Sequence, residues 1–95
     1  MAIFVIALNN PADSEFRKRI ATHYPQPRSY EFSDSLFFVS EDNIPQVIAE
    51  VLGIRVEKEE ERIAKGVVFR LNGAYSGFTQ RALWDWLNLA EEHEK

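Results

Sequence analysis

Residues 3–8 read Ile-Phe-Val-Ile-Ala-Leu, a continuous apolar run rich in β-branched side chains. Successive side chains of a strand point to opposite faces of its sheet, and both alternating sets of this run are apolar. Such a pattern is typical of a strand that is covered on both faces. The run is far shorter than the roughly 20 residues of a membrane span, and it lacks the positively charged start of a secretory leader. We therefore expect a buried strand here.

The whole chain has 95 residues, which is room for a single domain spanning residues 1–95. Its apolar share of 45% and its charged share of 27% match ordinary globular proteins. It has no cysteine, which excludes a disulfide framework and a thiolate metal site. The formal charge of −4 is opposite in sign to that of most nucleic-acid binders. These features predict a soluble, cytoplasmic protein with no membrane attachment.

A helix is expected to follow the first strand, from about Pro11 to Tyr24. Asn10 is a good N-cap, and proline suits the first helical position. Phe16, Ile20 and Tyr24 recur at every fourth residue, so they predict the buried stripe of this helix.

Two short strands, residues 30–32 and 36–39, are predicted next, with the turn formers Ser33-Asp34-Ser35 between them. A single bent strand is the alternative interpretation. The charged residues 54–65, further along, predict a solvated loop or a short exposed helix.

A second helix is expected between the strand 36–39 and the charged segment 54–65, from about Ile44 to Leu52. Asp42 or Asn43 is the expected N-cap. Gly53 is the expected left-handed residue that ends the helix, because glycine adopts that backbone conformation without strain.

The last two elements are a strand over residues 67–71 and a helix from about Gln80 to Glu92, with Thr79 as its N-cap. In the strand, alternate residues from Val67 to Leu71 fill one face. At about 100° per residue, one stripe of the helix is apolar. That stripe comprises Ala82, Leu83, Trp86, Leu87 and Ala90.

This order of elements predicts an α+β fold, namely a ferredoxin-like βαββαβ antiparallel sheet with an extra C-terminal helix. Another small α+β arrangement of the same elements is the alternative. The two internal helices would cover one face of the sheet, yet the strands are apolar on both faces. Leaving one such side chain in water forgoes about 1.5–3 kcal/mol. The second face must therefore be covered by the last helix, by a second copy packed sheet to sheet, or by both, and we predict a homodimer because isologous dimers are the commonest homo-oligomers.

Trp84 lies roughly 130° from the middle of the apolar stripe of the last helix, beside Arg81. Tryptophan is enriched at the energetic centres of interfaces. Packing on Tyr75 or Phe78 of its own chain, or a role as a ligand platform, are the alternatives. We predict a partner-binding surface that comprises Trp84, Arg81, Tyr75, Phe78 and Arg70.

No catalytic or cofactor-binding constellation is visible in the sequence. The dinucleotide fingerprint, the Walker pattern and the nucleophile elbow are all absent. Asp13 and Asp34 are explained as a helix-start residue and a turn former, and His23 and His93 lack partners at metal-ligand spacing. No cofactor and no metal site are therefore predicted.

A basic group, made of Arg17, Lys18, Arg19 and Arg28, lies near Tyr24 and Tyr30 in the sequence. Exposed charges on the first helix explain most of this group. Nucleic-acid contact is possible in principle, but it is not the favoured interpretation.

The layout resembles the small ferredoxin-like group that includes the CRISPR adaptation subunit and the virulence-associated D ribonucleases. The resemblance rests on the strand 3–8, the polar segment 9–13, the hairpin 30–39 and the strand 67–71. It implies dimers formed through the sheets, and a metal-dependent nuclease whose catalytic acid is an Asp at the end of the first strand. In this chain Leu8-Asn9-Asn10 occupies that region, and a neutral amide does not replace a metal-binding carboxylate.

These observations favour a small, non-catalytic interaction or regulatory module that acts as a homodimer, with a further protein as a possible partner. The alternative is a metal-dependent nuclease of the ferredoxin-like type, which rests on analogy of fold.

Overall fold

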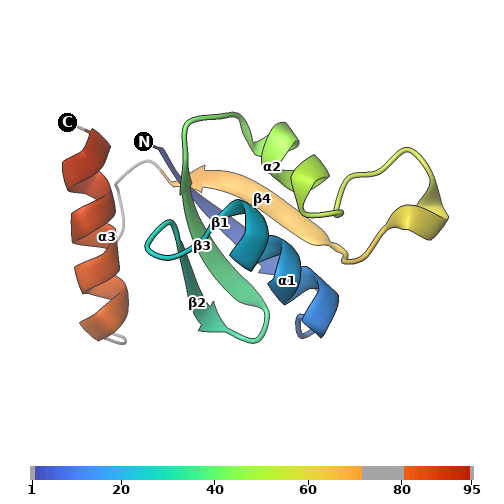
Figure 1. Cartoon of the computed structure of the whole chain (residues 1–95), viewed down its shortest axis with the longest axis horizontal. Helices are drawn as coiled ribbons and strands as arrows, with labels where there is room; N and C mark the ends of the chain where they lie inside the picture. The colour runs from blue at the N-terminus through green and yellow to red at the C-terminus, as the bar shows by residue number, and fades with distance from the viewer. Residues whose placement is uncertain (1, 72–80, 95) are drawn as a thin grey trace.

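The computed structural model describes residues 2–71 and 81–94, with side chains described as far as residue 90. The elements follow the order β1 (Ala2–Leu8), α1 (Ser14–His23), β2 (Ser29–Ser33), β3 (Leu36–Glu41), α2 (Pro45–Val51), the 3-10 turn η1 (Glu59–Glu61), β4 (Gly66–Leu71) and α3 (Arg81–Glu94). The strands form one antiparallel sheet in the order β2-β3-β1-β4 (Figure 1). This confirms the predicted α+β fold, a ferredoxin-like sheet with an additional C-terminal helix.

One face of the sheet is covered by α1 and α2. Phe4 and Ile6 of β1 point to this face and are completely buried. The predicted stripe of α1, which consists of Phe16, Ile20 and Tyr24, is buried in the same core cluster. The spacing of apolar residues in the sequence therefore predicted this layer correctly.

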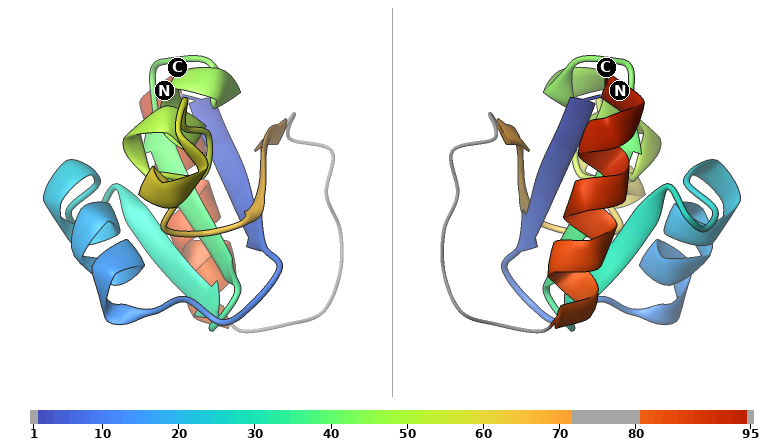
Figure 2. Two further views of the ribbon diagram at one scale, coloured as in Figure 1. Left: turned by 90° about the vertical axis from the view of Figure 1, so that its right-hand side faces the viewer. Right: turned by 90° about the vertical axis from the view of Figure 1, so that its left-hand side faces the viewer.

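The opposite face is covered by α3, which crosses in front of the sheet in the right-hand view of Figure 2. Ile3, Val5 and Phe38 of the two central strands are buried in this second core cluster. From α3 the cluster takes Leu83, Trp86, Leu87 and Ala90. The terminal helix is thus one cover of the second face, as the sequence predicted among its alternatives.

Trp86 fixes the position of α3 on the sheet. Its indole N–H donates a 2.8 Å hydrogen bond to the carbonyl of Pro27, just before β2. Its ring centroid lies 6.2 Å from that of Tyr30 on β2 and 6.2 Å from that of Phe38 on β3. A buried indole needs such a partner for its N–H, so this residue holds the helix over the β2 side of the sheet.

The start of α1 differs from the sequence prediction. Asp13, not Asn10, is the N-cap, and its Oδ1 accepts a 2.9 Å hydrogen bond from the backbone N–H of Phe16. Pro11 therefore precedes the helix. A carboxylate satisfies a free N–H as an amide would and adds a favourable interaction with the helix dipole.

The hairpin between α1 and α2 consists of two strands, so the alternative of one bent strand is wrong. α2 begins at Pro45 with Ile44 as its N-cap, so the prediction of Asp42 or Asn43 as the N-cap is wrong. The Oδ1 of Asn43 accepts a 2.9 Å hydrogen bond from the N–H of Ile44, just before the helix. Gly53 has φ 74°, which confirms the left-handed conformation expected after this helix.

One residue of the predicted α3 stripe is misplaced. Ala82 is exposed, whereas Leu83 beside it is 5% exposed. Among the described helices, none is long and apolar enough to cross a bilayer.

Candidate functional site

Trp84 lies on the flank of α3 that faces β1 and β4. Trp86 contacts Tyr30 on β2, and Trp84, two positions earlier, is about 200° away around the helix. The strand order β2-β3-β1-β4 then places Trp84 toward β4. Its side chain is partly buried against the second core cluster, so it packs on its own chain and also keeps an exposed portion.

Val67 and Phe69 form an exposed apolar row on β4. The register pairs them with Ala7 and Val5 of β1, so they lie on the sheet face that α3 covers. Val5 is 5% exposed, whereas Val67 and Phe69 are 54% and 45% exposed. Among the described residues on this second face of the sheet, Val67 and Phe69 are the ones that α3 leaves exposed.

The width of one helix explains why the row stays open. A helix with its side chains is roughly 10–12 Å across, and strands are spaced roughly 4.8 Å apart. One helix therefore covers two to three strands, and α3 lies against β1 and β2 with β3 between them, which leaves β4 outside its width. From the sequence, the last helix is one expected cover of this face, and a comparison of helix width with strand spacing would have predicted that it leaves one strand open.

The five residues of the predicted partner surface do not all come together. Trp84 and the exposed Arg81 belong to α3 on the second face. Arg70 is also exposed, but its register partner is Phe4, so it points to the face of α1 and α2. β4 ends and α3 begins at opposite ends of the sheet (Figures 1 and 2). Tyr75 and Phe78 lie outside the described residues.

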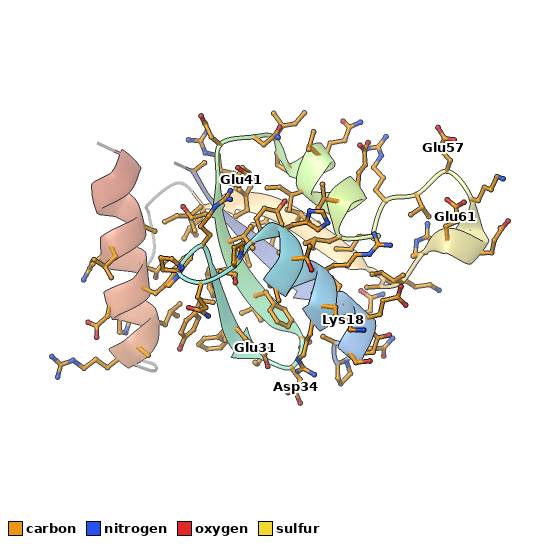
Figure 3. All side chains as sticks on the ribbon, in the orientation of Figure 1. Lys18, Glu31, Asp34, Glu41, Glu57 and Glu61 are labelled. Carbon is orange, nitrogen blue, oxygen red and sulfur yellow. The ribbon has the colours of Figure 1, made fainter. Side chains whose placement is uncertain are left out.

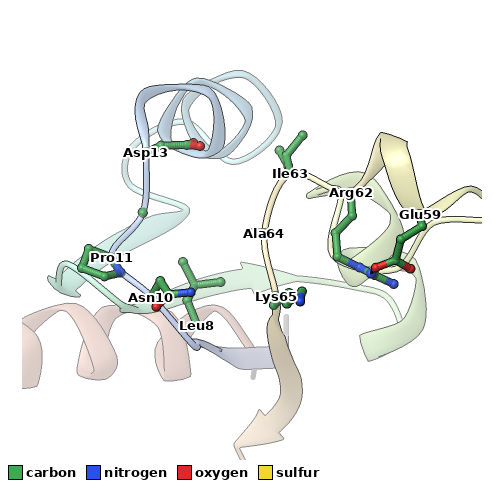
Figure 4. Close-up of a pocket in the computed structure, with 10 residues that line it drawn as sticks. Leu8, Asn10, Pro11, Asp13, Glu59, Arg62, Ile63, Ala64 and Lys65 are labelled. Atoms are coloured by element: carbon green, nitrogen blue, oxygen red, sulfur yellow. Dashed lines mark hydrogen bonds and ion pairs between the residues drawn. The ribbon is translucent and has the colours of Figure 1, made fainter.

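A polar cleft of about 390 Å³ lies at the carboxyl end of β1 (Figure 4). Asn10 and Asp13 line one side of it, and Arg62 and Lys65 line the other. This is the place where the resemblance to nucleases requires a catalytic acid. Asp13 is engaged as the N-cap of α1, and Arg62 forms an ion pair with Glu59. The groups left to meet a ligand are therefore an amide and a lysine rather than two carboxylates.

The remaining acidic residues near this end surround the guanidinium of Arg17. Its Nε and Nη2 donate hydrogen bonds of 3.2 and 3.1 Å to the two carboxylate oxygens of Glu31, and Nη2 lies 3.6 Å from Asp34 Oδ1. Figure 3 shows Glu31 and Asp34 projecting from the same hairpin. The hydrogen bond to Glu31, helped by the neighbouring carboxylates, raises the pKa of Arg17. The guanidinium of Arg17 thus neutralises charge on the carboxylates of Glu31 and Asp34.

The predicted basic group is largely engaged in interactions within the chain. Besides Arg17, Arg28 pairs with Glu41 at 2.8 Å and lies over the ring of Tyr24. Arg19 donates a 3.2 Å hydrogen bond to the carbonyl of Val51 at the end of α2. These interactions bind α1 and β2 to their neighbours, so the group is not a free basic surface.

Metal ligands are not clustered in residues 2–71 and 81–94, where no group of three or more His, Cys, Asp or Glu side chains has a suitable arrangement. No protein-family model matches the sequence, and comparison with curated proteins and with solved structures gives no significant match. The resemblance to the nuclease group therefore stays a prediction.

Proposed function

We propose that this chain is a small non-catalytic interaction module that acts as a homodimer. The observation that carries the proposal is the exposed row of Val67 and Phe69 on a sheet face whose other described side chains are buried or half-buried. Full burial of such a side chain is favourable by about 1.5–3 kcal/mol. A second copy that brings the same row would bury both rows at once, as an isologous contact does.

The flank of α3 that carries Trp84 extends this surface. A specific interface buries roughly 800 Å² per partner. The described chain exposes 6168 Å², so such an interface would take about an eighth of its surface. Two residues of one strand do not supply that area. Trp84 is partly buried on the flank of α3 that turns toward β4, so it would supply an aromatic anchor, and the exposed Arg81 would provide a polar rim.

Light scattering on purified protein tests this proposal. We expect the mass of a dimer for the unaltered chain, the mass of a monomer for Phe69→Glu, and a weakened dimer for Trp84→Ala. Leu89→Glu is the matched control, because Leu89 is 56% exposed on the other flank of α3. A chain that stays monomeric at high concentration, or a dimer that ignores Phe69→Glu, would contradict the proposal.

The nuclease alternative is not supported by the placement of its acids, since Asp13 caps α1 and Asp34 faces Arg17. Incubation with RNA and DNA in the presence of Mg²⁺ or Mn²⁺ is the direct measurement. Cleavage that disappears in Asp13→Ala or Asp34→Ala would favour the nuclease over the interaction module.

A further inference from the structure

The two edges of the sheet differ in how they are protected. β2 forms one edge, where the register with β3 shifts between Glu31 and Ser33 and Glu31 is held in an ion pair by Arg17. Such irregularities and charges hinder the addition of another strand. β4 forms the other edge, and its register with β1 is unbroken from Gly66 to Leu71. β4 is therefore the edge that is better suited to pair with another strand.

The outer side of β4 carries backbone hydrogen-bonding groups at alternate residues. Asn9 donates a 2.8 Å hydrogen bond to the carbonyl of Lys65, so the backbone of Lys65 faces β1. Backbone groups along an antiparallel strand alternate between its two sides. The outward N–H and C=O groups therefore belong to Gly66, Val68 and Arg70. Among the described strands, none pairs with this side of β4.

We propose that two copies of the chain pair through this edge, β4 against β4, in antiparallel register about a two-fold axis at Val68. The inference rests on the proposed homodimer and specifies how its two copies meet. Val68 of each copy exchanges hydrogen bonds with Val68 of the other, and Gly66 of each copy does so with Arg70 of the other. The two sheets then join into one continuous sheet.

This register brings the exposed apolar rows of the two copies together. Val67 of each copy falls directly opposite Phe69 of the other, on the face where α3 leaves both residues exposed. They form non-hydrogen-bonded pairs, in which the Cα atoms are roughly 4.5 Å apart and the side chains touch. A pair of an aromatic and a β-branched side chain is favourable in this position. A register centred on Val67 would instead set the charged Lys65 opposite Phe69.

The charges of β4 favour the same register. Arg70 falls opposite Gly66, which has no side chain, and the two Arg70 residues are four positions, or roughly 13 Å, apart along the strands. A register centred on Phe69 would halve that separation, and like charges close together across a sheet are unfavourable. Lys65 points to the opposite face from Arg70. Arg55 lines the groove beside Gly66, but its side chain is exposed and can turn away.

Cysteine crosslinking tests this register, because the chain has no cysteine of its own. A single introduced cysteine can therefore form a disulfide only with the same residue of a second copy. The two Val68 residues would have Cα atoms roughly 5.5 Å apart, which is within the usual range for a disulfide. Arg70→Cys is the matched control on the same face of the same strand, where the two positions are too far apart to be bridged.

We expect Val68→Cys to crosslink at least tenfold faster than Arg70→Cys under mild oxidation, although Arg70 is the more exposed residue. Adding Phe69→Glu to Val68→Cys should abolish the crosslink, because it breaks the apolar pairs beside the axis. Equal crosslinking of Val68→Cys and Arg70→Cys would overturn the inference. Crosslinking of Val67→Cys alone would also overturn it, since Val67 points to the second face and would then meet its counterpart between packed faces.

Hydrogen exchange on the unaltered chain gives a second measurement that needs no substitution. In the dimer, the outward amides of Gly66, Val68 and Arg70 should exchange roughly tenfold more slowly, or slower still, than in the dilute monomer. Exchange that is equally fast at all protein concentrations would overturn the inference. Protection that persists in the monomer would overturn it too, because a segment of the same chain would then occupy the edge.

Failure of this inference is distinguishable from failure of the proposed homodimer. A chain that has the mass of a monomer at all concentrations contradicts both. A chain that has the mass of a dimer, but neither crosslinks through Val68→Cys nor protects the outward amides, keeps the homodimer and overturns the pairing of the β4 edges.

Discussion

At the scale of single residues, the carboxylate of Asp13 determines where α1 begins. Its hydrogen bond to the N–H of Phe16 satisfies one of the free donors in the first turn. Asp13→Ala should lower the free energy of unfolding by about 1 kcal/mol, the usual cost of losing an N-cap. Urea denaturation measures this change. Asp13→Ser should retain most of the stability, and Asn10→Ala should change little. An equal loss in Asn10→Ala would return the cap to the position that the sequence suggested.

Tyr24, another single residue, makes stability depend on pH. Its side chain is 2% exposed, and burial, followed by the charge of Glu41, raises the pKa of its phenol above the ordinary value. An unfolded tyrosine ionises near pH 10, whereas the folded chain retains the proton to higher pH. The folded state then binds more protons, so this contribution is complete below about pH 10 and is lost as pH rises further. Tyr24→Phe should unfold with a smaller alkaline loss, measured by urea denaturation at increasing pH. An identical alkaline slope in both proteins would contradict the shift.

At the scale of elements, α3 is held to the sheet by one face, and its exposed residue Leu89 should contribute little to stability. Leu87 is 2% exposed in the second core cluster, whereas Leu89 on the same helix is 56% exposed. Leu87→Ala should destabilise the fold by about 2–5 kcal/mol, the usual cost of such a cavity. Leu89→Ala should change stability by less than about 0.5 kcal/mol. Thermal unfolding compares the pair. Similar losses in both variants would mean that α3 is not packed as described.

The elements also show what periodicity predicts and what it does not. Both faces of β1 and the stripe of α1 follow from side-chain alternation and spacing, because burial is a repeating property of each element. The N-cap was misplaced because Asn10, Asp13 and the proline between them all suit a helix start. The ion pair between Asp34 and Arg17 joins the turn between β2 and β3 to α1. It forms only because the tertiary fold brings these two segments together, which the sequence pattern does not reveal. For the same reason, the opposite placement of Arg70 and Trp84 was not predictable from their nearness in the sequence.

At the scale of the whole molecule, helices α1 and α2 cover one face of the sheet, whereas α3 leaves Val67 and Phe69 of β4 exposed on the other face. We expect this exposed row to make the melting temperature depend on protein concentration. If a second copy covers Val67 and Phe69, dimer formation stabilises only the folded chain. A tenfold increase in protein concentration then favours the dimer by about 1.4 kcal/mol. Shared between two chains, that gain should raise Tm by roughly 3–5 °C for a domain of this size. Calorimetry at increasing concentration measures the shift, and Phe69→Glu should show none. A Tm that is independent of concentration in the unaltered chain would mean that the open row faces water in a stable monomer.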